Sequence, residues 1–132
     1  MKIYDSDSNL LAIVVHNNES SESKNFITKD EAEFQLATFN LPKNTEILKH
    51  YHPPQKREIK STSEVLVVLE GELRVDIYSM DQELIQSVNL KNGDFVNMIS
   101  GGHGIYVESD CRFIEVKQGP YIEEIDKIRF WL

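Results

Sequence analysis

Short apolar runs separated by turn residues are the feature that most limits what this chain can fold into. The runs are rich in Val, Ile, Leu and Phe, are four to eight residues long, and many end close to Gly, Pro, Asn or Asp. Such runs are typical of β-strands, whereas a helix needs a longer apolar pattern with a period of three to four residues. The expected strands are Leu10–Val15, Phe34–Leu41, Thr45–His52, Glu64–Leu69, Leu73–Tyr78, Leu84–Leu90, Phe95–Ile99, Ile105–Glu108 and Arg112–Lys117. The pattern predicts a mostly β sandwich or barrel.

Two segments leave the choice between helix and strand open. Thr28, followed three residues later by Glu31, resembles a capping box and favours a helix start. Apolar and polar residues alternate from 33 to 38, however, which is the period of a strand, so we expect a strand with at most one helical turn before it. The last segment, Tyr121–Leu132, fits either a short closing helix or a strand.

Length and charge exclude several classes of protein. A chain of 132 residues falls in the range of one domain, so we expect a single domain over residues 1–132. A net charge of −8 opposes attraction to phosphates, which argues against a nucleic-acid partner. The longest apolar run, Leu10–Val15, is far shorter than the roughly 20 residues that cross a bilayer. With no basic and apolar leader at its start, the chain is expected to be cytoplasmic and free of membranes.

The single cysteine limits the chemistry of any metal site. Cys111 has no partner for an intramolecular disulfide or for a thiolate zinc site, so a bound metal must use nitrogen and oxygen ligands. His50 and His52 are spaced as i and i+2 at the end of an expected strand, where both imidazoles would point to the same face and could share one ion. The alternative is a pair of surface or hydrogen-bonded histidines.

Two further features could carry chemistry. Glu64 opens an apolar strand, and a carboxylate that points inward there needs a cation, a metal or hydrogen-bond donors, because burying it unpaired costs several kcal/mol. It could equally be an exposed residue at a strand start. His103 is surrounded by Gly101, Gly102 and Gly104, which let the backbone pass close to whatever the imidazole touches. The alternative is a flexible hairpin tip.

These residues, taken together, resemble the two motifs of the cupin superfamily. The first motif joins a His-x-His pair to a Glu and then, after six intervening residues, to a Gly, and the second joins a Gly to a distant His. The matching residues are His50, His52, Glu64, Gly71, Gly93, Gly101 and His103. More narrowly, the ending Ile114–Tyr121 is similar to that of small single-domain cupins found beside surface-polysaccharide genes.

The chain departs from the usual cupin motifs at several positions. Eleven residues separate His52 from Glu64, where three or four are usual, and His103 follows Gly101 one residue early. Asn44, Ile99 and Val107 stand where the motifs have Gly, Pro and Asn. The extra residues Pro53–Ser63 are expected to form an excursion at the mouth of the site.

The resemblance implies a double-stranded β-helix, a jelly-roll barrel of two antiparallel sheets, with one divalent metal ion inside. The implied ligands are His50, His52, His103 and Glu64. Glu64 rather than Glu58 takes the carboxylate role, because its six-residue spacing to Gly71 matches the motif. Nitrogen and carboxylate donors suit Fe, Mn, Ni, Co or Zn, and the sequence does not select one.

Two residues are candidates for binding a ligand. Arg57, in the excursion, could hold a carboxylate or phosphate in a forked pair, although an arginine in a polar loop is often simply solvated. Glu115 could bond a substrate hydroxyl if its strand lines the barrel, and otherwise faces water. No residue is assigned a catalytic role.

The resemblance implies a function class and no particular reaction. Cupins include sugar isomerases and epimerases, dioxygenases, decarboxylases and non-enzymatic binding modules, so the fold alone does not choose among them. We expect a metal-binding cupin that takes a small polar or sugar-like metabolite and either converts it, by isomerase, epimerase or oxygenase chemistry, or only binds it. A metal-free binding or regulatory cupin is the alternative. A homodimer is the expected assembly.

Overall fold

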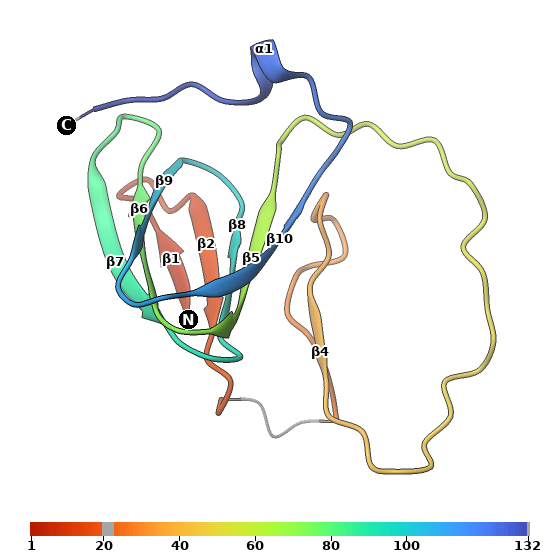
Figure 1. The fold of residues 1–132 in the computed structure, drawn as a ribbon. Coiled ribbons are helices and arrows are strands. Elements are labelled where there is room, and N and C mark those ends of the chain that lie inside the picture. Colours follow the sequence, from red (N-terminus) through yellow and green to blue (C-terminus); the bar gives the residue numbers. More distant parts are fainter. Residues whose placement is uncertain (20–22, 132) are drawn as a thin grey trace. The chain divides into compact units, whose positions relative to one another are not determined.

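The structure is a computed structural model that describes residues 1–19 and 23–131 (Figure 1). Its regular structure is almost entirely β, as the run lengths predict, and all of its paired strands are antiparallel. The elements are β1 (Lys2–Tyr4), β2 (Leu10–Val15), β3 (Lys24–Phe26), β4 (Ala37–Phe39), β5 (Glu64–Glu70), β6 (Leu73–Tyr78), β7 (Leu84–Leu90), β8 (Phe95–Met98), β9 (Gly102–Val107), β10 (Arg112–Lys117) and the one-turn helix α1 (Glu123–Asp126). No helix among the described residues is long and apolar enough to span a membrane.

The chain divides into two compact units. The first contains residues 1–17 and 62–132, and the second contains residues 18–61. The position of one unit relative to the other is not determined, so each is described by itself. The single domain expected over residues 1–132 therefore stays a prediction.

The first unit is built from two antiparallel sheets. One has five strands in the order β1-β2-β8-β5-β10, and the other has three in the order β7-β6-β9. No ladder between described strands of this unit joins the two sheets, so the strands do not close into a barrel.

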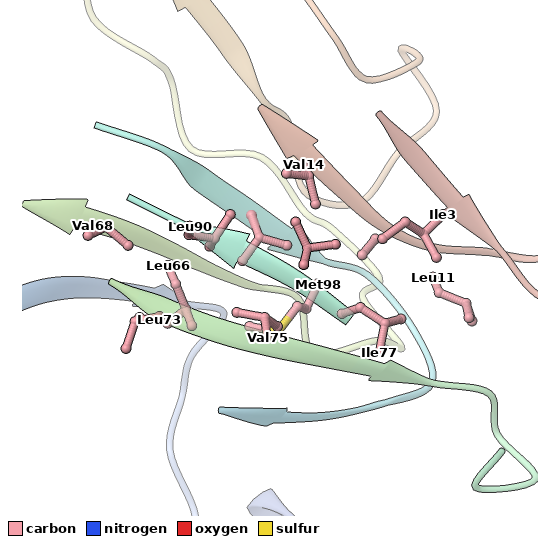
Figure 2. Close-up of a cluster of buried hydrophobic side chains, with 13 residues drawn as sticks. Ile3, Leu11, Val14, Leu66, Val68, Leu73, Val75, Ile77, Leu90 and Met98 are labelled. Carbon is pink, nitrogen blue, oxygen red and sulfur yellow. The ribbon is translucent and has the colours of Figure 1, made fainter. Parts of the chain in front are cut away.

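The hydrophobic core lies between these two sheets (Figure 2). Alternate residues of β6 point inward, and the inward positions of β2, β5 and β8 face them. Each fully buried Leu, Ile or Val side chain contributes about 1.5–3 kcal/mol relative to exposure. The core residues are Ile3, Leu11, Ala12, Val14, Leu66, Val68, Leu73, Val75, Ile77, Val88, Leu90, Val96 and Met98.

The turn between β5 and β6 explains one of the glycines that match the cupin motifs. Gly71 has φ +90, a backbone conformation that side chains disfavour, and a Cβ there would collide with the carbonyl oxygen of Asp110. The Gly71 amide donates to the side-chain oxygen of Asn92 at 2.9 Å. The glycine is therefore required by the turn itself, whatever the unit binds.

The edge strands β9 and β10 carry uncovered side chains on their core-facing sides. In the register of the sheets, Ile105 lies opposite Val75 and Val107 opposite Leu73, so both share the face of core residues. Phe113 lies opposite Val68 in the same way. Yet Ile105, Val107 and Phe113 are 41%, 53% and 38% exposed. The core-facing sides of β9 and β10 therefore carry apolar side chains that are only partly buried.

The second unit contains one small hairpin. Its strands β3 and β4 pair from Lys24 with Phe39 to Phe26 with Ala37, and the two phenylalanine rings pack edge to face at 5.9 Å. Near the end of the unit, Glu33 accepts hydrogen bonds from the amides of Lys60 and Ser61 at 3.2 and 3.0 Å. These contacts tie the end of the excursion back to the unit.

The predicted strands overlap with strands of the first unit, where β9 begins at Gly102 rather than at the expected Ile105 and so includes His103, and they differ more in the second unit. The bounds of β2, β6, β7 and β10 are those expected from sequence. The expected strand Phe34–Leu41 is reduced to β4, because the Gln35 amide group bonds the carbonyls of Lys29 and Ala32 and holds a compact turn rather than a helix or strand. The expected strand Thr45–His52 has no regular secondary structure.

Candidate functional site

Glu64 and His103 lie together in the first unit. Glu64 is the first residue of β5 and shares the inward face of Leu66 and Val68, and His103 on β9 lies opposite the core residue Ile77. The imidazole Nε2 is 3.5 Å from the carboxylate Oε2 of Glu64. The Glu64 side chain is 14% exposed and the His103 side chain is 32% exposed, so the pair lies near the end of the core, partly open to water.

A third ionisable group, Glu115 on β10, joins this pair. Glu115 lies opposite Leu66 in the β5–β10 ladder and so shares the inward face, but it belongs to an edge strand and is exposed. A hydrogen bond with Glu64 raises the pKa of Glu115, with burial and the Glu64 charge acting in the same direction. The hydrogen bond from His103 lowers the pKa of Glu64 to about 2, against the effect of burial, and the bond with Glu115 helps. The charged form is therefore favoured at Glu64 and disfavoured at Glu115.

Lys117 extends this cluster and was not assigned a role from sequence. It lies opposite Glu64 in the ladder, and its ammonium is 3.2 Å from Oδ2 of Asp126. The hydrogen bond with Asp126 raises the pKa of Lys117. The sequence could have indicated that Lys117 belongs to this cluster, because Glu115 and Lys117 are spaced as i and i+2 on one strand and so share a face.

His50 and His52 lie together in the second unit. Their ring centroids are 5.3 Å apart at an interplanar angle of 82°, and both side chains are exposed. Nδ1 of His50 is 2.7 Å from the carbonyl oxygen of Leu48, to which it donates. Because Nδ1 carries the proton, Nε2 of His50 keeps its lone pair. A histidine needs this tautomer to bind a metal through Nε2. The i, i+2 spacing brings the rings together, although the segment is not a regular strand.

The four predicted metal ligands thus form two pairs. Glu64 and His103 meet in the first unit, and His50 and His52 meet in the second, and the structure describes the pairs separately. Within the described residues, no three His, Cys, Asp or Glu side chains gather as a metal-ligand group. The four-ligand site stays a prediction.

The two predicted ligand-binding residues lie in different units. Glu115 belongs to the cluster of the first unit, and Arg57 is an exposed residue of the excursion in the second. His16 lies apart from the cluster, at the end of β2, where its Nδ1 is 3.0 Å from the buried Asp94.

No protein-family model, curated protein or solved structure matches this chain.

Proposed function

We propose that this chain is a cupin-like protein that holds one divalent metal ion and binds a small polar metabolite beside it. The observation that carries the proposal is the pairing of donors. The first unit brings Glu64 and His103 together across its two sheets, and the second brings His50 and His52 together through their spacing of two residues. A chance scatter of side chains would not be expected to produce both pairs.

The donor atoms of the first unit are spaced as ligands of one ion. Two atoms each about 2.1 Å from a metal lie about 3.0 Å apart at right angles and about 3.4 Å apart at the tetrahedral angle. The separation of His103 Nε2 and Glu64 Oε2 is 3.5 Å. An ion between them would replace the shared proton with little movement of either side chain. Three imidazole nitrogens and one carboxylate suit Fe, Mn, Ni, Co or Zn.

The free edges of the first unit support closure into a jelly roll. A jelly roll is made of two packed sheets, and the apolar side chains on the inner face of every strand have to be buried between them. β9 and β10 end their sheets with exposed apolar side chains on the core-facing side. These uncovered apolar side chains are the surface that closure into a jelly roll would bury.

The ligand that fits the cluster is a hydroxyl-bearing or carbonyl-bearing molecule. Glu115, when protonated, can donate a hydrogen bond to a substrate oxygen, and Glu64 and His103 then remain available to a metal. Arg57 would meet an anionic group at the entrance. A bound divalent ion would polarise a carbonyl or hydroxyl oxygen of the ligand.

One observation favours a second candidate, a metal-free binding protein. The lowered pKa of Glu64 shows that its charge is already stabilised by His103, 3.5 Å away, without a cation. In this alternative the same three side chains bond ligand hydroxyls directly.

Elemental analysis decides between the two candidates. Protein purified without an affinity tag or chelator should contain about one divalent metal per chain. His50→Ala and His103→Ala, one from each unit, should each reduce the content to near zero. His16→Ala is the matched control, because His16 belongs to the Asp94 pair, and it should keep the wild-type content.

Two results would reject the shared site. Unchanged metal content in both His50→Ala and His103→Ala would mean that neither pair binds the ion. Loss in one variant only would mean that one pair binds it without the other. A protein free of metal throughout that still retains a small molecule in native mass spectrometry would favour the metal-free candidate.

A further inference from the structure

The C-terminal segment, residues 118–131, is held at two places in the first unit. It leaves the end of β10, passes through α1 and returns across the ends of the strands in the three-stranded sheet (Figure 1). At the first place, Lys117 lies 3.2 Å from Asp126 and its ammonium is 5.0 Å from the centre of the Tyr121 ring. The Lys117 and Asp126 side chains are only 19% and 10% exposed, so this contact is sheltered from water.

The second place is formed by Phe130 on the three-stranded sheet. Its ring packs edge to face on Tyr78, with centroids 5.3 Å apart at 87°. Two of its ring carbons lie 2.8 Å from where a Cβ of Gly102 would be, so any side chain at that position would collide with the ring. Tyr78 and Gly102 are opposite residues of β6 and β9. Because Lys117 belongs to the five-stranded sheet, the segment connects both sheets.

The Glu64–His103–Glu115 cluster lies along the path between these two contacts. The Phe130 ring packs on the outer face of β9, over Gly102, whereas the next residue, His103, points to the core face. Lys117, at the other contact, lies opposite Glu64, so the segment between the two contacts crosses the end of the core where the cluster lies. The positive charge of Lys127, which belongs to the segment, lowers the pKa of Glu115. Between the contacts the segment is loosely held, since Ile128 is 91% exposed.

We propose that residues 118–131 form a strap that controls access to the Glu64–His103–Glu115 cluster. The Lys117–Asp126 pair is its fixed end, and Phe130 on Gly102 is the end that releases. A single aromatic contact opens more readily than a sheltered ion pair that includes a strand residue. The strap rests on the proposed function for the identity of the site that it covers, but its test needs neither metal nor ligand.

The reactivity of His103 measures whether the strap limits access. The full chain, freed of metal, is treated with diethyl pyrocarbonate, and modification of each histidine is followed by peptide mass spectrometry. Phe130→Ala should raise the modification rate of His103 about two- to tenfold, the range expected for loss of one aromatic contact. Phe130→Leu, which keeps part of the bulk, should give a smaller increase.

Two controls keep the result specific. Ile128→Ala removes an exposed side chain from the same strap and should leave the His103 rate unchanged. His16, in the same unit, reports general loosening, because its rate should be equal in all variants. The fluorescence anisotropy of Trp131, the only tryptophan, should fall in Phe130→Ala and not in Ile128→Ala.

The strap is overturned by either of two outcomes. A His103 rate in Phe130→Ala equal to that of the wild type would mean that the segment does not limit access. Equal increases in Phe130→Ala and Ile128→Ala would mean that the Phe130 contact is not what holds it. Neither outcome bears on metal content, so failure of the strap and failure of the metal site are told apart.

Discussion

Glu64 and Glu115 are two neighbouring carboxyl groups whose pKa values are shifted in opposite directions. His103 donates to Glu64 and so stabilises the charged form there, while the neighbouring negative charge disfavours ionisation of Glu115. Pairs of titratable groups whose pKa values are driven apart are typical of functional sites, although structural networks also produce them. Under the proposed function, the charged Glu64 would bind the cation, and Glu115, when protonated, would donate a hydrogen bond to the ligand.

Acid should weaken the fold through Glu64. Its pKa is about 2 in the folded chain, below the ordinary value of 4.5, so the stabilisation is present above about pH 4.5 and is lost as the pH falls toward 2. The free energy of unfolding in urea should therefore fall between pH 5.5 and pH 3, and this decrease should be smaller in Glu64→Gln than in the wild type. Glu124→Gln, at an exposed residue of α1, is the control and should follow the wild type. Parallel curves for Glu64→Gln and wild type would contradict this role.

Glu115→Gln should act in the opposite direction. The raised pKa of Glu115 means that its ionised form is disfavoured in the folded chain, so ionisation costs stability as the pH rises. A neutral amide keeps a donor for Glu64 and removes the repulsion. The melting temperature of Glu115→Gln should exceed that of the wild type at pH 8, and the difference should shrink at pH 5. A lower melting temperature at both pH values would show that the pair does not share a proton.

Asn97 on β8 offers a test away from the site. Its side chain is fully buried, neither of its polar side-chain atoms has a hydrogen-bond partner among the described residues, and its cross-strand neighbours are Ile13 and Val65. Because an unsatisfied buried polar group costs about 1–3 kcal/mol, Asn97→Val should raise the free energy of unfolding by a similar amount. Equilibrium unfolding in urea measures it, and a loss of stability would mean that Asn97 has a partner.

At the scale of elements, the sequence predicts best where a strand buries its own residues. The continuous apolar run of β2 and the strict alternation of β6 are local patterns, so their bounds follow from sequence alone. β1 and β3, of three residues each, are too short to leave a pattern, and both were missed. Segment 45–52 has a strand-like composition but depends on a partner distant in the chain, which no local pattern specifies.

The site shows the same division between local and distant information. The His50–His52 pair follows from a spacing of two residues. The meeting of Glu64 with His103 depends on two different sheets and was indicated only by the cupin resemblance. Lys117 and Asp126 come together through the turn after β10, which no spacing rule predicts.

Segment 45–52 should become ordered when metal binds. If His50 and His52 bind the ion shared with His103, the segment is fixed against the first unit and its amides gain protection. Hydrogen exchange followed by mass spectrometry should slow in peptides covering 45–52 on addition of Zn²⁺, and His103→Ala should abolish the slowing. Peptides of β6, already in the centre of a sheet, are the reference and should not change. Equal exchange with and without metal would argue against closure of the fold by this segment.

At the scale of the whole molecule, the two units complement each other in composition. The first has two edge strands with uncovered apolar side chains, and the second has segments of strand-like sequence whose Leu48 and Tyr51 side chains are exposed. Each unit alone leaves hydrophobic surface in water, and exposed apolar surface of this kind favours contact with other apolar surface. The expected homodimer stays a prediction.

Diffraction data collected at the absorption edge of the bound metal test the central claim most directly. The account predicts one anomalous peak per chain, bonded at about 2.0–2.2 Å by imidazole nitrogens of His50, His52 and His103 and by a carboxylate oxygen of Glu64. A peak bonded to the His50–His52 pair without His103, or to His103 and Glu64 without that pair, would contradict it.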